Sequence, residues 1–292
     1  MLQKMRNILS YMPALFTAIV WGSTFVASKN VLSAGVSPIL LMTVRFSLAY
    51  IILLMLNRQR MRFEFNTTEL KLFLVGTCGG SVYFLVEYMA LQHTSAVNVG
   101  LISATVPTIS TAIDSFLRHK RLKLIFVVGS VVAFVGVALL VTNGKFSFQI
   151  FPFGDALAIL SSMLWAIYSV VLSRVGSDIA ESVVERRMLL YSLITIMPVT
   201  VYMFDIDEVK MLFSSVDVWL CAAYLGIVAS AFCLWLWNVS INKIGIVRTN
   251  NFLYMLPVVS LIVSAIFTSG EVTMLTVIST VLIFVGIVMA DC

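Results

Sequence analysis

Glu87 is a carboxylate within an otherwise apolar run, four residues after Tyr83. On a helix this spacing places both side chains on one face. A charge at the centre of a bilayer costs roughly 2.5–3.5 kcal/mol and therefore usually faces the protein interior or a water-filled cavity. We predict that Glu87 binds a proton or a cation at a functional site. The alternative is a structural carboxylate, paired with Lys29 or Arg45 or placed near the outer headgroups.

Three further charged residues lie inside or at the ends of apolar runs. Lys29 lies near one end of its run, where it can extend to the headgroups. Arg45 lies deeper, where it would bind an anionic group of a substrate or join two helices. Asp114 precedes Arg118 by four residues, which predicts a local ion pair.

Aromatic and amide side chains recur within the apolar runs. Aromatic faces suit flat apolar or cationic solutes, and amides hydrogen-bond a solute or a neighbouring helix. Ordinary helix packing is the alternative for each of them. The predicted lining of a central cavity is Trp21, Thr24, Tyr83, Glu87, Asn98, Trp165, Tyr168, Trp237, Asn251 and Tyr254.

Composition indicates that lipid surrounds these residues. The chain is 60% hydrophobic and 11% charged, whereas a soluble domain carries about 25% charged residues. About 20 mostly apolar residues are needed to cross a bilayer as a helix. We therefore predict an all-α integral membrane protein with ten spans, near residues 11–32, 38–57, 70–91, 95–117, 123–142, 153–174, 185–204, 217–238, 246–267 and 272–290.

The basic residues predict the orientation. Fifteen of the 19 Lys and Arg residues lie in segments that share one side if the spans alternate, and the basic side is cytoplasmic. Arg186 and Arg187 are counted among these loop residues. Lys29, Lys145 and Lys210 fall on the outer side. We expect a multi-pass protein of the inner (cytoplasmic) membrane with both termini in the cytoplasm.

An offset of 150 residues aligns the two parts of the chain. Residues 131–137 match residues 281–287, and Pro107 matches Pro257, while an offset of 144 aligns Trp21 with Trp165. Five spans in each part, residues 1–146 and 147–292, would give the repeats opposite orientations, as in many secondary transporters. Pro107 and Pro257 would kink their helices and serve as hinges. Small residues at Gly129, Gly136, Ser279 and Gly286 predict close packing with a neighbouring helix or a second copy.

Several motifs resemble the drug/metabolite transporter superfamily in its ten-helix EamA type. They are residues 21–29 (WGSTFVASK), 45–46 (RF), 90–96 (ALQHTSA), 154–158 (GDALA) and 270–271 (GE). The Gly-Glu pair usual after the fourth span is replaced by His119-Lys120-Arg121, which argues against a carboxylate function there. The resemblance implies export or exchange of amino acids, metabolites or drugs, often coupled to protons.

We therefore expect a secondary transporter that exports amino acids or related small metabolites or drugs. The alternative is an exchanger of nucleotide sugars or sugar phosphates, for which the spans contain few cations. The two His residues and four Cys residues form no metal-ligand or nucleophile–base pattern, so we expect neither an enzyme nor a cofactor. The expected partners are a small-molecule substrate, the bilayer and protons, without nucleic acid, in a monomer or homodimer.

Overall fold

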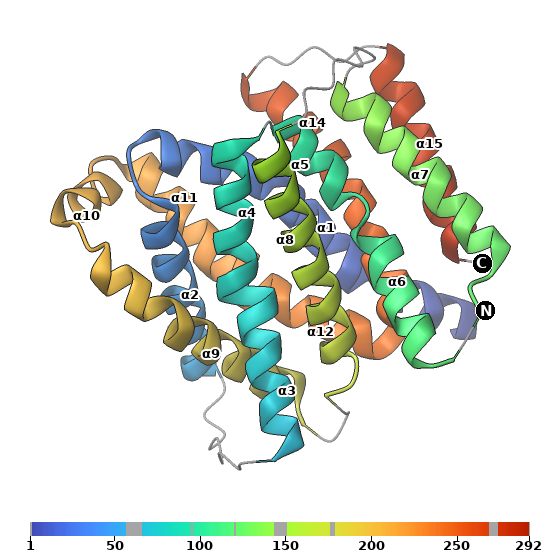
Figure 1. Ribbon diagram of the computed structural model, residues 1–292, viewed down its shortest axis with the longest axis horizontal. Helices are drawn as coiled ribbons and strands as arrows, with labels where there is room; N and C mark the ends of the chain where they lie inside the picture. Colours follow the sequence, from blue (N-terminus) through green and yellow to red (C-terminus); the bar gives the residue numbers. More distant parts are fainter. Residues whose placement is uncertain are drawn as a thin grey trace.

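The computed structural model describes residues 2–56, 66–94, 96–119, 121–142, 151–175, 179–268 and 274–291, and these contain helices and no strand (Figure 1). The loop cations Arg58, Arg60, Arg62, Lys120 and Lys145 and the Gly270-Glu271 pair lie outside the described residues. The elements are α1 (Leu2–Ser33), α2 (Pro38–Leu56), α3 (Thr67–Gly76), η1 (Thr77–Ser81), α4 (Val82–His93), α5 (Ala96–Ser103), α6 (Val106–Leu117), α7 (Leu124–Thr142), α8 (Pro152–Leu172), α9 (Glu181–Tyr202), α10 (Ile206–Leu212), α11 (Val216–Gly226), η2 (Ile227–Phe232), α12 (Cys233–Ile244), α13 (Ile246–Asn251), η3 (Phe252–Met255), α14 (Leu256–Thr268) and α15 (Met274–Asp291).

The helices fit a protein that crosses a membrane several times. Within the described residues, seven helices are long and apolar enough to span a bilayer, and an eighth if α9 and α10, bent by 118° to each other, count as one span. The remaining expected spans are shorter or interrupted. The expected span at 95–117 is two helices, α5 and α6, and α15 has a shorter apolar stretch, Met274–Ala290.

Pro107 and Pro257, the two predicted hinges, lie just after interruptions in their helices. Residues 104–105 separate α5 from α6, and Pro107 is in the first turn of α6. The 3₁₀ segment η3 separates α13 from α14, which carries Pro257 as its second residue. Proline disfavours helical backbone at the preceding residue and lacks an N–H. The expected distortions are present, and the hinge function of Pro107 and Pro257 stays a prediction.

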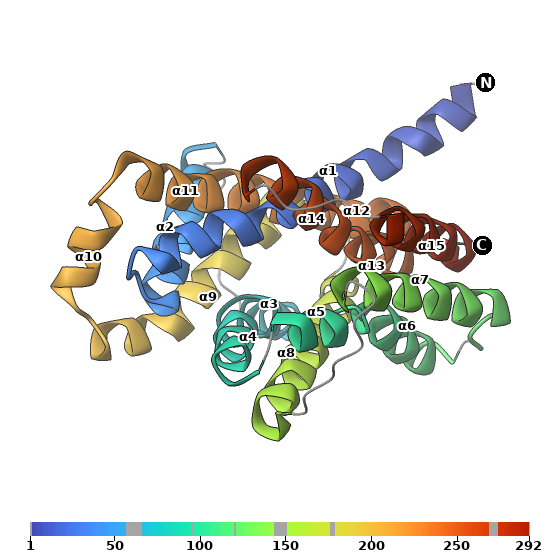
Figure 2. The same cartoon turned by 90° about the horizontal axis from the view of Figure 1, so that it is seen from above.

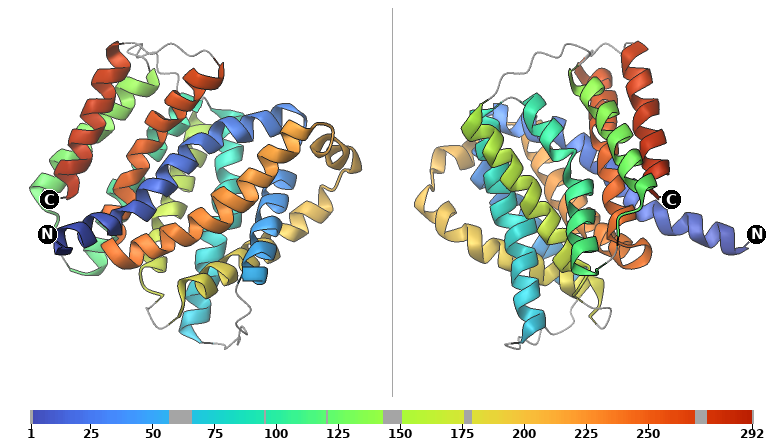
Figure 3. Two further views of the ribbon diagram at one scale, coloured as in Figure 1. Left: turned by 180° about the vertical axis from the view of Figure 1, so that it is seen from behind. Right: turned by 45° about the vertical axis from the view of Figure 1, so that its right-hand side comes forward.

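The two halves of the chain pack against each other reciprocally. From the N-terminal half, α1 and α2 pack on α11, η2 and α12, whereas α8 and α9 from the C-terminal half pack on α3, η1 and α4. Figure 3 shows α1 running alongside α12. Figure 2 shows the N-terminal end of α1 projecting beyond the other helices.

Two π-helical segments, η1 and η2, interrupt the helices that begin with α3 and α11. They begin 150 residues apart, at Thr77 and Ile227, which is the offset that aligns the sequence halves. In η1, Gly79 packs on the ring of Tyr168, where an added Cβ would lie 2.1 Å from the ring carbon Cδ2. Single π turns within α-helices occur frequently at functional sites.

Helices α7 and α15 form a separate close-packed pair, side by side in Figures 1 and 2. A Cβ added to Gly286 would lie 2.3 Å from the backbone nitrogen of Ala133, and one added to Gly136 would lie 2.9 Å from the carbonyl oxygen of Ser279. The predicted packing role of Gly129, Gly136, Ser279 and Gly286 is confirmed, and their partner is the other helix of this pair within the chain.

We expect Gly286→Val to destabilise the α7–α15 pair, because the added atoms meet backbone that has little room to move. The expected loss is about 1–3 kcal/mol. Thermal unfolding of the detergent-purified protein would show it as a lower midpoint. Val281→Leu is the matched control, since Val281 lies on the same helix and is 55% exposed. Equal midpoints for both variants would contradict the close-packing account.

Candidate functional site

Five aromatic side chains from four helices meet at the centre of the molecule; we call them the aromatic cluster. Trp21 of α1 lies 5.5 Å from Trp165 of α8 and 4.9 Å from Trp237 of α12, between ring centroids. Trp165 lies 4.9 Å from Tyr83 of α4 and 5.0 Å from Tyr168. These are favourable distances for aromatic pairs. The structure thus brings together five of the residues that the sequence predicted for a cavity.

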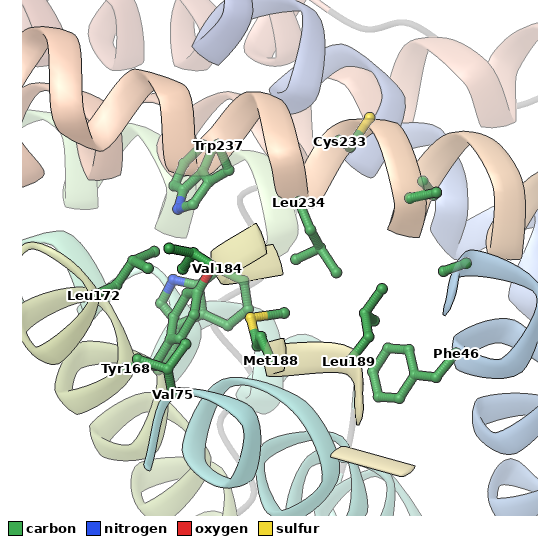
Figure 4. Close-up of a cluster of buried hydrophobic side chains, with 14 of the residues drawn as sticks. Phe46, Val75, Tyr168, Leu172, Val184, Met188, Leu189, Cys233, Leu234 and Trp237 are labelled. Carbon is green, nitrogen blue, oxygen red and sulfur yellow. The ribbon is translucent and has the colours of Figure 1, made fainter. Parts of the chain in front are cut away.

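Some polar atoms of this cluster form hydrogen bonds and others do not. Trp21 donates its Nε1–H to the carbonyl of Ala229 in η2, at 2.9 Å. The Nε1 atoms of Trp165 and Trp237 and the hydroxyl of Tyr168 are buried without a hydrogen-bond partner among the described residues. Figure 4 shows Trp237 and Tyr168 pointing toward one another from α12 and α8. Buried polar atoms without partners are uncommon, so this group is a candidate for binding a solute.

Arg45 and Glu87 lie beside the cluster. Tyr83 donates its hydroxyl hydrogen to Glu87 Oε1 at 2.7 Å. Arg45 donates Nε–H to the Ser230 hydroxyl in η2 at 2.5 Å, and its guanidinium lies 4.9 Å from the ring centroid of Phe84. Among the described residues Glu87 and Arg45 form no direct ion pair.

Two of the other predicted lining residues make bonds within or between helices. Thr24 donates to the Trp21 carbonyl at 2.6 Å, and Asn98 donates to Asp155 at 2.9 Å. Asn98 therefore joins α5 to the start of α8. The side chain of Lys29 lies outside the described part of the structure.

The remaining two lie near the helix interruptions that precede the prolines. Tyr254 belongs to a second apolar group that includes Ala104 and Val137, and its hydroxyl lies 3.3 Å from that of Thr108. Asn251 is 1% exposed, and both polar atoms of its amide lack a hydrogen-bond partner among the described residues. A solute-binding role for either residue stays a prediction.

Glu185 is a buried carboxylate that sequence reasoning missed. The pair Arg186-Arg187 had indicated the cytoplasmic edge of a span that begins at residue 185, whereas the helix extends further toward the N-terminus. Helix α9 begins at Glu181, and residues 183–189 are all buried. The sequence offered one indication of this site, a Glu at the start of an apolar run. A Glu in that position is also common at an ordinary helix end, so it did not stand out.

Arg187 is stabilised there by an ion pair. It pairs with Glu69 of α3, which also accepts a hydrogen bond from the hydroxyl of Tyr191. Both charged side chains are little exposed, at 10% and 13%. A carboxylate that accepts bonds from a guanidinium and a phenol compensates for the burial of the Arg187 charge.

Other charged pairs gather where α6, α8 and α3 end or begin. Arg118 donates Nε–H to Asp114 at 2.8 Å, as predicted, and Arg174 lies 3.8 Å from the same carboxylate oxygen. Lys71 donates to the backbone carbonyl of Arg174 at 2.9 Å. These contacts tie the helix ends together on one side of the molecule.

Comparison with known proteins identifies the family. Residues 8–142 and 152–290 each match the EamA-like transporter family. The chain belongs to the EamA-like transporter family. It is a multi-pass membrane transporter of the EamA type, consistent with its apolar helices.

Its relatives are transporters of similar length. It is similar to the uncharacterized transporter YyaM of Bacillus subtilis (strain 168), with 24% identity over 98% of this chain and 95% of that one. An uncharacterized transporter of Archaeoglobus fulgidus is 24% identical over 93% of this chain and 94% of that one. A protein of known crystal structure shares the fold, with a TM-score of 0.76, 20% identity and 96% coverage of each chain.

We expect Glu69→Gln and Arg187→Gln each to destabilise the protein, because either change leaves its partner uncompensated. Loss of one partner of a buried ion pair costs about 3–5 kcal/mol. The double variant should lose less than the sum of the two single variants. Thermal or denaturant unfolding of the purified protein would measure this coupling. Strict additivity would show that the pair contributes no mutual stabilisation.

Proposed function

We propose that this transporter moves small organic solutes by alternating access between two inverted five-helix repeats, residues 1–146 and 147–292. In this arrangement the chain crosses the membrane ten times, with the interrupted α5–α6 and α13–α14 segments each forming one crossing. Nearly equivalent halves of opposite orientation provide two states of similar energy, one open to each side. The reciprocal packing of the halves and the matching positions of η1 and η2 support the proposal.

The observation that carries the proposal is the aromatic cluster. Trp21 comes from the first half and Trp165 and Trp237 from the second, and their rings are in contact. A relative movement of the halves would therefore separate these rings and open a space between them. Aromatic walls with a few polar atoms without partners are typical of solute-binding sites.

We further propose that the protein exports amino acids or related metabolites from the cytoplasm, with Glu87 as the proton-coupling carboxylate. Tyr83 is the hydrogen-bond donor to Glu87, so protonation would release or reverse this bond. The Arg45 guanidinium lies 4.9 Å from the ring centroid of Phe84, on the helix that carries Glu87, and would bind the anionic group of the solute.

Transport into proteoliposomes from a panel of radiolabelled amino acids, with and without a pH gradient, tests this function. Trp21→Ala and Trp165→Ala should each lower the rate about tenfold or more, which corresponds to about 1.4 kcal/mol of lost solute contact. Trp219→Ala is the control, since Trp219 lies on α11 with 43% exposure. Absence of transport throughout the panel would contradict the proposed substrate class.

The coupling proposal has its own variant in the same assay. Glu87→Gln keeps the shape of the side chain and removes its titration, so the rate should no longer respond to the pH gradient. Tyr83→Phe should weaken the response without abolishing it, because the carboxylate remains. A response unchanged in Glu87→Gln would exclude Glu87 as the coupling group.

The proposed orientation can be tested by labelling single cysteines in a variant whose native cysteines are replaced by serine. A cysteine at Arg121 should react with a membrane-impermeant maleimide only after the cytoplasmic side is opened. A cysteine at Lys210, whose side chain is 71% exposed, should react in intact cells. The opposite pattern would show that the termini lie outside.

A further inference from the structure

Glu185 is the most completely buried carboxylate in the described part of the protein. It is 1% exposed, and its Oε1 atom has no hydrogen-bond partner there. An ionised carboxylate in such a place is costly unless it is paired. Among the described residues no cation forms an ion pair with Glu185, so a group from outside the chain is the natural candidate.

The neighbours of Glu185 on α9 pack in the same apolar group as the aromatic cluster. The hydroxyl of Tyr168 in that cluster also lacks a hydrogen-bond partner among the described residues. Figure 4 shows the flanking α9 residues Val184 and Met188 beside Tyr168 and Trp237. Glu185 therefore adjoins the same apolar group as the rings that the proposed function assigns to the solute.

The nearby arginines do not neutralise Glu185. Arg187 pairs with Glu69 on α3. Consecutive residues of a helix point about 100° apart, so Arg186 leaves α9 on another face, and the described structure contains no ion pair between it and Glu185.

We propose that Glu185, with the hydroxyl of Tyr168 and the faces of Trp165 and Trp237, forms a binding subsite for the cationic group of an organic ammonium solute. The carboxylate would accept hydrogen bonds from an ammonium group, and the aromatic faces would attract the same charge. The indole N–H groups of Trp165 and Trp237 would donate to acceptor atoms elsewhere on the solute. This inference rests on the proposed function and specifies further that the solute carries a positive charge.

The subsite differs in location and chemistry from the Arg45–Glu87 group. Glu185 comes from the first turns of α9, near the Arg187–Glu69 pair, whereas Arg45 binds Ser230 in η2 and Glu87 binds Tyr83. In the proposed orientation Glu185 lies on the cytoplasmic side of the aromatic rings. A cytoplasmic solute would thus meet Glu185 before it meets Arg45.

Binding to the full-length protein in detergent tests the subsite, with quenching of tryptophan fluorescence as the readout. The probes are two matched pairs, 2-phenylethylammonium with 2-phenylethanol and butylammonium with butan-1-ol. The wild type should bind at least one ammonium probe more tightly than its alcohol. Glu185→Gln should weaken that binding about tenfold or more, as expected for loss of a charge-assisted hydrogen bond. The affinity for the matching alcohol should stay within about twofold of the wild-type value.

Glu181→Gln is the matched control, because it removes a carboxylate one turn earlier on the same helix, at a partly exposed position. It should bind all probes as the wild type does. Thermal unfolding midpoints near that of the wild type would show that both variants are folded. If Glu185→Gln does not fold, Tyr168→Phe serves as the second variant. It should lower the affinity for the ammonium probe more than the affinity for the alcohol.

Three results would overturn the subsite: no binding of either ammonium probe, equal affinity for ammonium and alcohol in the wild type, or equal losses for both probes in Glu185→Gln. Different results would contradict the proposed function. Ammonium binding that depends on Glu185 without transport in proteoliposomes would retain the subsite and exclude the function. Transport without any ammonium preference would retain the function and exclude the subsite.

Discussion

A helix that crosses lipid must satisfy its own backbone hydrogen bonds, because the surrounding hydrocarbon offers no partners. Every departure from regular α-helix in this protein must therefore be enclosed by other helices. The π segments η1 and η2 meet this condition, since Gly79, Gly80, Ala229 and Ser230 are all buried. Side chains of the candidate site contact these segments: Ala229 accepts a hydrogen bond from Trp21, Ser230 accepts one from Arg45, and Gly79 packs on Tyr168.

Charged side chains in the interior also need partners from the protein. The helix ends on one side are joined by pairs such as Arg187 with Glu69 and Arg118 with Asp114, which compensate one another. The groups beside the aromatic cluster are less completely compensated. Glu87 accepts from a phenol, and Glu185 has no hydrogen-bonding partner for Oε1 within the described structure. The charges at the helix ends are thus paired within the protein, whereas those proposed to bind a proton or solute are not.

Sequence reasoning identified the family, the helical membrane fold and the aromatic residues that meet at the centre. Trp21 and Trp165 were recognisable because they recur at matching places in both halves, whereas for a single aromatic residue ordinary helix packing is an equally good explanation. Asn98 was assigned to the cavity on residue type alone, and its partner Asp155 is remote in sequence. Glu185 was missed because a run of charges at a span end resembles a loop. Only the packing of α9 on α3 and α12 distinguishes the two cases.

The matching positions of η1 and η2 bear on the history of the chain. A π turn within an α-helix contains one residue more than an α turn. It therefore marks an inserted residue, which rotates the side chains of the following helix about the helix axis. Losing that residue from η1 would turn Tyr83 and Glu87 away from Trp165 and toward other neighbours. Under the proposed repeat, the same insertion stands in both halves at one offset. If the two halves arose by duplication, the inserted residue was already present in the unit that was duplicated.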